Sequence, residues 1–241
     1  TGVASVEYDY IRYLPAEIPS PYTFEEDYYP AAASTADPML SKQYALTKVH
    51  ASEAWAVNAG NAGVVVAVID GGVDYNHPDL KSHIWRNSRE IENGRDDDGN
   101  GYKDDFIGYN FRSENNNVYD DVPSGHGTHV AGIIAAVRNN SVGIAGLANV
   151  TIMPLKVFPA KGGARDSDII AAIEYAVANG ADVINMSLGG GSYNSAYERA
   201  CNRAYSRNVV IVGASGNDGA TKVFFPANLS SVIAVGAVDS K

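Results

Sequence analysis

An alternation of strand-like and helix-like segments begins at Val64 and continues toward the end of the 241-residue sequence. Such alternation is typical of a parallel β-sheet whose strands are joined by crossover helices, an α/β fold. The expected strands cover residues 64–70, 152–158, 183–187, 209–214 and 232–238, and the expected helices cover residues 130–136, 167–180 and 195–206. In the second helix, Ser167 is expected to be the N-cap residue and Gly180 to close the helix. Because glycines follow several strand ends, we expect the functional site at the carboxyl edge of the sheet, where open α/β folds bind ligands.

Two side chains stand at the ends of these segments with complementary chemistry. Asp70 ends an apolar run, and His126 lies between two glycines where a helix of small residues begins. The amino-terminal end of a helix disfavours a charged imidazole, which would keep His126 neutral and available as a general base. The pattern predicts that Asp70 orients His126 and that the imidazole serves a nucleophile.

Length and charge narrow the class of protein. The chain is long enough for one main domain with a full core. Its formal net charge of -10 argues against nucleic acid and anionic membranes as partners. The single cysteine, Cys201, is expected to be a buried structural thiol. No apolar stretch is long enough to cross a bilayer, and none has the pattern of a signal peptide.

The amino-terminal region differs from the rest. Residues 3–9 alternate like a single strand, and residues 11–36 are rich in Pro, Tyr and acidic residues with no sustained periodicity. The second stretch is expected to be an extended connector.

Four motifs in a fixed order resemble those of the subtilisin-like serine proteases, and in particular the calcium-dependent, thermitase-like members. They are residues 70–74 followed by 77–80, then residues 125–129, 185–190 and 214–217. The resemblance begins near Asp37 and implies a three-layer fold in which helices flank a central, mainly parallel sheet. It also implies that residues 1–36 are the tail of a propeptide with its connector, and that residues 37–241 belong to the catalytic domain. The alternative for residues 1–36 is a surface extension of the mature domain.

The resemblance assigns catalytic roles to three residues. Asp70 would orient His126, His126 would take the proton of a serine, and Asn217 would donate a hydrogen bond to the oxyanion. The family's serine motif, Gly-Thr-Ser-Met-Ala, does not occur in the sequence. We therefore expect this chain to be the Asp/His portion of a protease whose carboxyl-terminal segment is missing. The serine would come from that segment or from a second chain, and these residues alone would be inactive.

The resemblance also implies where a polypeptide substrate binds. Two extended segments would sandwich it, and a third would form one wall of the main specificity pocket. In that order the segments are Gly162, Gly163 and Ala164; Ser187, Leu188 and Gly189; and Ala214, Ser215 and Gly216. Arg165 and Asp166 fall where some relatives carry an aromatic lid over a more distal subsite, so the preference of that subsite is open. Phe225-Pro226 matches a family turn with a cis proline.

Two loops are expected to bind calcium. Residues 96–105 place oxygen donors at alternating positions, as in the first part of an EF-hand loop, with Asp96, Asp98, Asn100 and Asp104 as side-chain ligands. The family resemblance implies a second site, in which side chains and backbone carbonyls both contribute oxygen. Its side-chain ligands would be Asp37, Asp79 and Asn140, and its carbonyl ligands Val137, Val142 and Ile144.

Two other functions remain open at this point. A metal-dependent hydrolase would use some of the residues Asp70, Asp74, His77, His126 and His129, because imidazole and carboxylate suit zinc or manganese. That alternative leaves Asn217 without a role. A noncatalytic binding module would keep the fold and have lost its serine. The protease hypothesis implies polypeptide substrates, a possible propeptide partner and secretion.

Overall fold

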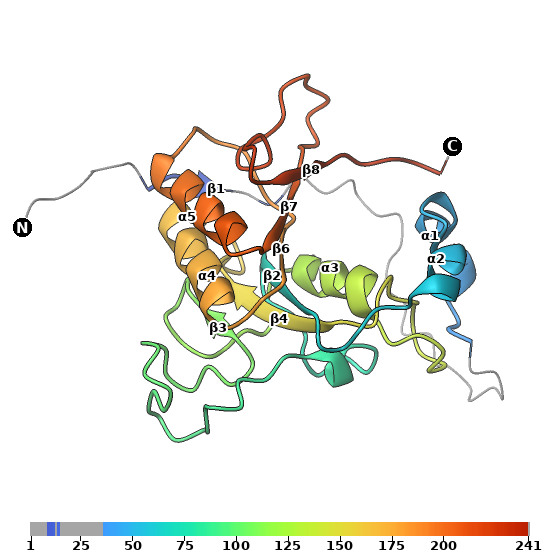
Figure 1. Ribbon diagram of the computed structural model, residues 1–241, viewed down its shortest axis with the longest axis horizontal. Coiled ribbons are helices and arrows are strands. Elements are labelled where there is room, and N and C mark those ends of the chain that lie inside the picture. The colour runs from blue at the N-terminus through green and yellow to red at the C-terminus, as the bar shows by residue number, and fades with distance from the viewer. Residues whose placement is uncertain (1–8, 13, 15–35, 241) are drawn as a thin grey trace, which may run out of the picture.

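The computed structural model describes residues 9–12, 14 and 36–240, and its centre is a six-stranded parallel sheet (Figure 1). The strand order is β3-β4-β2-β6-β7-β8, and every neighbouring pair is parallel. In chain order the strands are β2 (Val65–Asp70), β3 (Tyr109–Asn110), β4 (Thr151–Lys156), β6 (Val183–Met186), β7 (Val210–Ala214) and β8 (Ile233–Val235). The carboxyl ends of all six therefore lie at one edge of the sheet.

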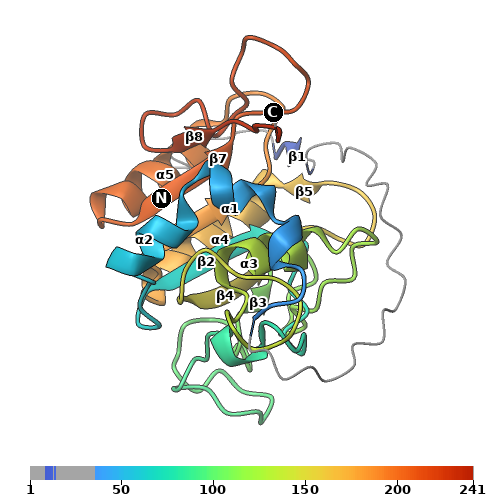
Figure 2. The ribbon, with the colours of Figure 1, turned by 90° about the vertical axis from the view of Figure 1, so that its right-hand side faces the viewer.

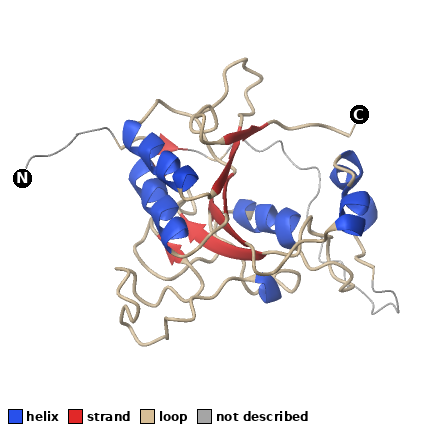
Figure 3. Cartoon of the chain, in the orientation of Figure 1, coloured by secondary structure: helices blue, strands red, loops and turns tan. Residues whose placement is uncertain are grey.

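Helices cover both faces of the sheet. They are α1 (Tyr44–Lys48), α2 (Ala51–Val57), α3 (His126–Ala135), α4 (Asp166–Ala178) and α5 (Ser195–Ser206), with short 3-10 helices at Leu40–Lys42 and Lys81–His83. Helices α4 and α5 pack on one face and α3 on the other (Figure 3). Helices α1 and α2 lie beyond α3, farther from the sheet (Figure 1), and are in front of it when the molecule is turned by 90° (Figure 2). This arrangement confirms the expected three-layer α/β fold.

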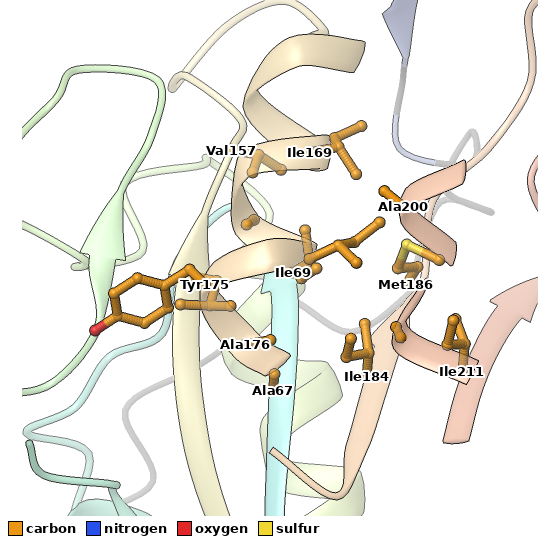
Figure 4. Close-up of a cluster of buried hydrophobic side chains, with 14 of the residues drawn as sticks. Ala67, Ile69, Val157, Ile169, Tyr175, Ala176, Ile184, Met186, Ala200 and Ile211 are labelled. Atoms are coloured by element: carbon orange, nitrogen blue, oxygen red, sulfur yellow. The ribbon is translucent and has the colours of Figure 1, made fainter. Parts of the chain in front are cut away.

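Two hydrophobic cores explain why strand β2 is apolar along its whole length. Ala67 and Ile69 point into the larger core, against α4 and α5, whereas Val66 and Val68 point into the smaller core against α3. Figure 4 shows the larger core, to which Ile69 of β2 and Ile169 of α4 both contribute. A strand buried on both faces requires an unbroken apolar run, which is the signal that the sequence carries.

The element boundaries agree with the sequence except at a few ends. Helix α5 has the predicted bounds, while β8 ends at Val235, before the predicted residue 238. Ser167 is not the cap of α4: the helix begins one residue earlier, and Arg165 is its N-cap residue. Gly180 closes this helix as predicted, because its φ of 77° needs glycine and lets Ala181 N–H donate to the Ala176 carbonyl.

A second, two-stranded sheet joins the amino-terminal end of the described residues to the segment just before α4. Strand β1 (Ile11–Arg12) pairs antiparallel with β5 (Ala164–Arg165). Most of the predicted amino-terminal strand, residues 3–8, and most of the predicted connector lie outside the described residues. The assignment of residues 1–36 to a propeptide therefore stays a prediction.

Candidate active site

Local sequence places Asp70 at the carboxyl end of β2 and His126 at the amino-terminal end of α3, and these two ends meet at the same edge of the sheet. Asp70 is the last residue of β2 and is fully buried, and its Oδ1 accepts a hydrogen bond of 2.7 Å from the N–H of Gly71. His126 is the first residue of α3. The N-cap residue before it, Gly125, adopts a left-handed conformation with φ of 61°, which glycine tolerates without strain. Glycines at both junctions thus turn the two side chains toward the sheet edge.

The two side chains form a carboxylate–imidazole pair. His126 Nδ1 lies 2.9 Å from each oxygen of Asp70, and the His126 side chain is 16% exposed. Burial raises the pKa of Asp70, and the hydrogen bonds from His126 and Gly71 oppose that rise. With its Nδ1 proton directed at Asp70, the imidazole presents Nε2 as its basic nitrogen. This tautomer suits a general base.

Close packing of α3 on β2 holds the pair together. A Cβ at Gly127 would lie 2.1 Å from the carbonyl oxygen of Gly72 and 3.1 Å from the Cβ of Asp70. Only a residue without a side chain allows this approach. Gly127 therefore sets the distance between His126 and Asp70.

The turn after Asp70 is steadied in a way that sequence reasoning did not foresee. A Cβ at Gly71 would lie 2.5 Å from Cγ2 of Val122, so any larger residue there would require Val122 to move. Buried Lys156, at the end of β4, donates from Nζ to the Gly71 carbonyl and, at 2.7 Å, to Asp121. A lysine at the end of an apolar strand was the available signal for this role.

A second polar chain ties α3 to the same turn. Buried Asp120 accepts hydrogen bonds from the N–H of Thr128 at 2.8 Å and from its hydroxyl at 2.7 Å. The Thr128 hydroxyl in turn accepts from the N–H of Asp74 at 2.9 Å. Asp120 was also missed from the sequence, because nothing in its spacing marks it.

The remaining predicted site residues follow other strands that end at the same edge. Asn217 lies three residues beyond the end of β7 and is exposed, and β7 is separated from β2 by β6. Ser215 donates its N–H to Val235, while Gly216, with φ of 118°, packs against the ring of Phe224. Asp70, His126 and Asn217 therefore come from β2, α3 and the loop after β7, all at the carboxyl edge of the sheet.

The predicted substrate-binding segments lie beside this edge. Leu188 and Gly189 are buried just after β6, and the Ser187 hydroxyl accepts a hydrogen bond from Asn185. The next residue, Gly190, donates its N–H to Phe225, whose peptide bond to Pro226 is cis as the resemblance implied. Gly162 and Gly163 lead into β5, where Ala164 pairs with Arg12. Of these segments, the one at β5 already has an extended strand bound along it.

Comparison with known proteins agrees with this geometry. A model of the subtilase family matches residues 61–241. The chain belongs to the subtilase family.

Three relatives show how much of a subtilase the chain represents. The thermophilic serine proteinase of Bacillus sp. (strain AK1) is 42% identical over 199 residues, which are 82% of this chain and 44% of that protein. Thermitase of Thermoactinomyces vulgaris is 38% identical over 208 residues, covering 84% and 65%. The halolysin-like extracellular serine protease Nep of Natrialba magadii is 35% identical over 205 residues, covering 84% and 35%. The chain thus spans between 35% and 65% of the length of these relatives.

The residues of the metal-hydrolase alternative do not gather around one point. His129 is exposed, and His77 Nδ1 accepts a hydrogen bond from the N–H of Asp79. Within residues 9–12, 14 and 36–240, the group of His, Cys, Asp and Glu side chains that could hold a metal contains neither Asp70 nor His126.

That group lies in the acidic loop and includes a residue that the sequence pattern did not reveal. Glu90, Asp96 and Asp98 each place a carboxylate oxygen within 4.8 Å of the others. Glu90 is only 6% exposed; its Oε1 accepts from the N–H groups of Asp97 and Asp98, while its Oε2 is buried without a hydrogen-bond partner. Glu90 lies six positions before Asp96, outside the alternating pattern of residues 96–105, so no ligand spacing pointed to it.

The other two predicted ligands of this loop make different contacts. Asn100 donates from its side chain to Asp105 at 2.9 Å. The carboxylate of Asp104 accepts from the N–H groups of Asn93 and Gly94. Neither belongs to the group of three carboxylates.

The second predicted metal loop brings two buried carboxylates, those of Asp37 and Asp79, into hydrogen-bond contact with Asn140. Asp37 accepts from the N–H groups of Asn139 and Asn140, and the Asn140 side chain donates to Asp79 at 2.7 Å. Burial is the main cause that raises the pKa of Asp79, and the charge of Asp37 adds to it. Of the predicted carbonyl ligands, Ile144 also donates its N–H to Asp79, Val142 donates its N–H to Asn140, and Val137 donates its N–H to the Asp79 carbonyl.

None of the helices among the described residues is both apolar enough and long enough to cross a membrane.

Proposed function

We propose that the protein to which this chain belongs is a serine endopeptidase that hydrolyses peptide bonds by acyl transfer. The observation that carries the proposal is the Asp70–His126 pair, in which Nδ1 lies 2.9 Å from both carboxylate oxygens. Membership in the subtilase family supports this use of the pair. A noncatalytic module would have no need of a buried carboxylate at this position.

Each group has a defined part in the reaction. Asp70 holds the imidazole in one tautomer and stabilises the imidazolium that forms. His126 takes the proton of the serine hydroxyl as its oxygen attacks the carbonyl carbon, and then gives that proton to the leaving amine. Asn217 donates a hydrogen bond to the oxyanion of the tetrahedral intermediate. We propose that the serine comes from a segment outside these 241 residues or from a second chain, and that these residues alone do not hydrolyse peptides.

Labelling with a fluorophosphonate probe tests the proposal on the complete protein. A serine activated by His126 reacts with the probe, so labelling is expected and His126→Ala abolishes it. Asp70→Asn is expected to lower turnover of a peptide substrate by about 10⁴-fold, the loss typical of a triad carboxylate. His129 lies on the same helix and is exposed, so His129→Ala is a matched control that should leave turnover unchanged.

Other results would point to the other functions. Complete absence of labelling, together with retained peptide binding, would indicate a noncatalytic module. Hydrolysis that chelators abolish without any probe labelling would indicate a metal-dependent hydrolase.

We propose further that the acidic loop binds calcium. The fit rests on Glu90, whose buried Oε2 lacks a hydrogen-bond partner and lies beside the carboxylates of Asp96 and Asp98. A calcium ion would offset this concentration of negative charge and stabilise the loop. Tyrosine-sensitised terbium luminescence reports binding, since Tyr102 belongs to the same loop. Glu90→Gln should weaken terbium binding much more than Glu92→Gln, a control at an exposed carboxylate two residues away.

A second calcium ion is proposed at Asp37, Asp79 and Asn140, with the carbonyls of Val137, Val142 and Ile144. Two carboxylates that are 4% and 2% exposed support this site, because their mutual repulsion needs a cation to offset it. Gly143 leaves the space that the Asp79 carboxylate fills, since a Cβ there would lie 2.4 Å from its Oδ2. Isothermal titration with calcium should therefore give two sites, one of which Asp79→Asn removes.

The substrates proposed are polypeptides bound in an extended conformation between the segments at Gly162–Ala164 and Ser187–Gly189. Backbone hydrogen bonds to such edges supply affinity for many sequences. A propeptide is proposed as an intramolecular partner. Secretion is proposed as well, supported by the relative whose name describes it as extracellular.

A further inference from the structure

One arginine near the amino-terminal end of the described residues is entirely buried. Arg12 has 0% of its surface exposed, although arginine is among the residues least often buried unless it is paired. It lies in a short strand that no sequence pattern marked as part of the core. Burying its charge requires a site built to receive it.

The pocket around Arg12 supplies a partner for each part of the guanidinium group. Nε and Nη2 donate to the two oxygens of Asp166, the second at 2.7 Å, so the contact is bidentate. Nη1 donates to the Gly190 carbonyl, and Nη2 also donates to the Ser192 carbonyl at 2.8 Å. The ring of Phe225 lies 4.8 Å from the guanidinium carbon. The pocket thus combines charge, planarity and an aromatic face, which together favour arginine over lysine.

Asp166 is held in place independently of Arg12. It is 1% exposed and is the first residue of α4, and Asn194 donates to its Oδ2 at 2.9 Å. A carboxylate at the amino-terminal end of a helix is stabilised there by the helix dipole. The acceptor is therefore part of the framework of the catalytic domain.

The backbone around Arg12 binds in the manner of an extended polypeptide. Arg12 lies opposite Ala164 in the antiparallel pair β1–β5, and the Asp166 N–H donates to the Tyr10 carbonyl at 2.8 Å. Asp9 accepts from the N–H and hydroxyl of Ser167 at the start of α4. Strand β5 follows directly from Gly162 and Gly163, the edge proposed to bind substrates.

We propose that the pocket formed by Asp166, Gly190, Ser192, Asn194 and Phe225 is a specificity pocket for an arginine side chain of a polypeptide bound along β5. In this chain, residues 9–12 occupy it in the manner of a substrate. That the bound polypeptide is a substrate rests on the proposed function. Some relatives carry an aromatic lid over a distal subsite, and Asp166 stands at that lid position in this chain. The proposal assigns arginine as the side chain that this subsite prefers.

Binding of a free peptide to the chain tests the pocket without any catalysis. The chain carries Asp9→Ala and Arg12→Ala, which remove both side-chain anchors of the resident strand. The probes are the hexapeptide of residues 9–14, Asp-Tyr-Ile-Arg-Tyr-Leu, and the same peptide with citrulline, a neutral group of the same shape, in place of arginine. Fluorescence anisotropy should show the arginine peptide binding about tenfold more tightly or better, as for hydrogen bonds between charged groups.

Two further variants assign the preference to Asp166. Adding Asp166→Asn should make the two peptides bind equally, because the carboxylate charge is gone while the side-chain shape remains. Adding Glu174→Gln is the matched control: Glu174 lies on the same helix and pairs with Arg203 on the exposed surface, so the tenfold preference should persist.

Equal binding of the two peptides to the variant with an intact Asp166, or absence of binding by either, would overturn the inference. Either result would mean that the ion pair only fastens residues 9–12. If the double variant does not fold, the unsubstituted chain is used at higher peptide concentration, where the free peptide competes with the resident strand and the same preference is expected. Failure of fluorophosphonate labelling would refute the protease proposal and leave the peptide preference intact, so the two failures are distinguishable.

Discussion

Two glycines of helix α3 should respond to alanine with opposite signs. Gly127 and Gly132 both lie in α3 and both are buried. A Cβ at Gly132 would meet only Cδ1 of Ile144, at 3.6 Å, which is an ordinary van der Waals contact. A Cβ at Gly127 would lie 2.1 Å from the Gly72 carbonyl oxygen, which belongs to the backbone and has no rotamer to adopt.

The magnitudes follow from two competing terms. Alanine gains roughly 1 kcal/mol over glycine inside a helix. Gly132→Ala should therefore raise the free energy of unfolding by up to about 1 kcal/mol. At Gly127 the forced displacement of α3 from β2 costs about 1–3 kcal/mol or more. Because that site is in the first turn, where the helical gain is smallest, Gly127→Ala should be net destabilising.

Thermal unfolding of the two variants measures the difference. A change of about 1 kcal/mol shifts the midpoint by roughly 2–4 °C in a domain of this size, so Gly132→Ala should melt higher and Gly127→Ala lower than the unsubstituted chain. In the complete protein, Gly127→Ala should also reduce fluorophosphonate labelling, because the shift separates His126 from Asp70. The reasoning is refuted if Gly127→Ala is as stable as Gly132→Ala.

Three other measurements test the electrostatics. Burial raises the pKa of Cys201 to about 12, so the thiol should stay inert to a disulfide reagent at pH 8 until the chain unfolds; rapid labelling of the native chain would contradict its burial. The raised pKa of Asp79 means that the native state without calcium holds more protons than the unfolded state, so its stability should fall as pH rises above about 3.9, the ordinary aspartate value. With saturating calcium the sign should reverse, because the ion requires the carboxylate; melting curves that respond equally to pH in chelator and in calcium would exclude a cation at Asp79. Asp120→Asn should lower melting temperature and turnover together, through its hydrogen bonds to Thr128, and a stable variant with full turnover would show that this chain of hydrogen bonds is dispensable.

Sequence reasoning succeeded where a signal is local and repeated. The run that became β2 is apolar throughout because both of its faces are buried, and the bounds of α5 follow from Asn194, which caps its first turn with hydrogen bonds to the N–H groups of Ala196 and Tyr197. Asp70 and His126 could be singled out because each stands at an element end beside glycine. The expected cap at Ser167 was wrong, since its N–H and hydroxyl bind Asp9, a residue 158 positions away.

The residues that sequence reasoning missed have partners remote in the chain. Glu90 joins Asp96 and Asp98 through a loop without fixed spacing, and Lys156 steadies the Gly71 carbonyl across 85 residues. Arg12 is separated from Asp166 by 154 residues. No periodicity relates such positions, so only the folded chain shows that they meet.

The sequence by itself determined the layered α/β architecture, the subtilase motifs and the identity of the carboxylate–imidazole pair. These are set by the alternation of apolar and polar residues and by glycines at element ends, which act over a few neighbouring positions. The tertiary structure decided how closely α3 approaches β2, which carboxylate completes the acidic group, and that Arg12 fills the pocket beside β5. Those outcomes depend on packing between segments that are distant in the sequence. At Gly127, a backbone oxygen 2.1 Å from the position of a Cβ excludes any side chain. At Arg12, a buried carboxylate determines where the guanidinium lies.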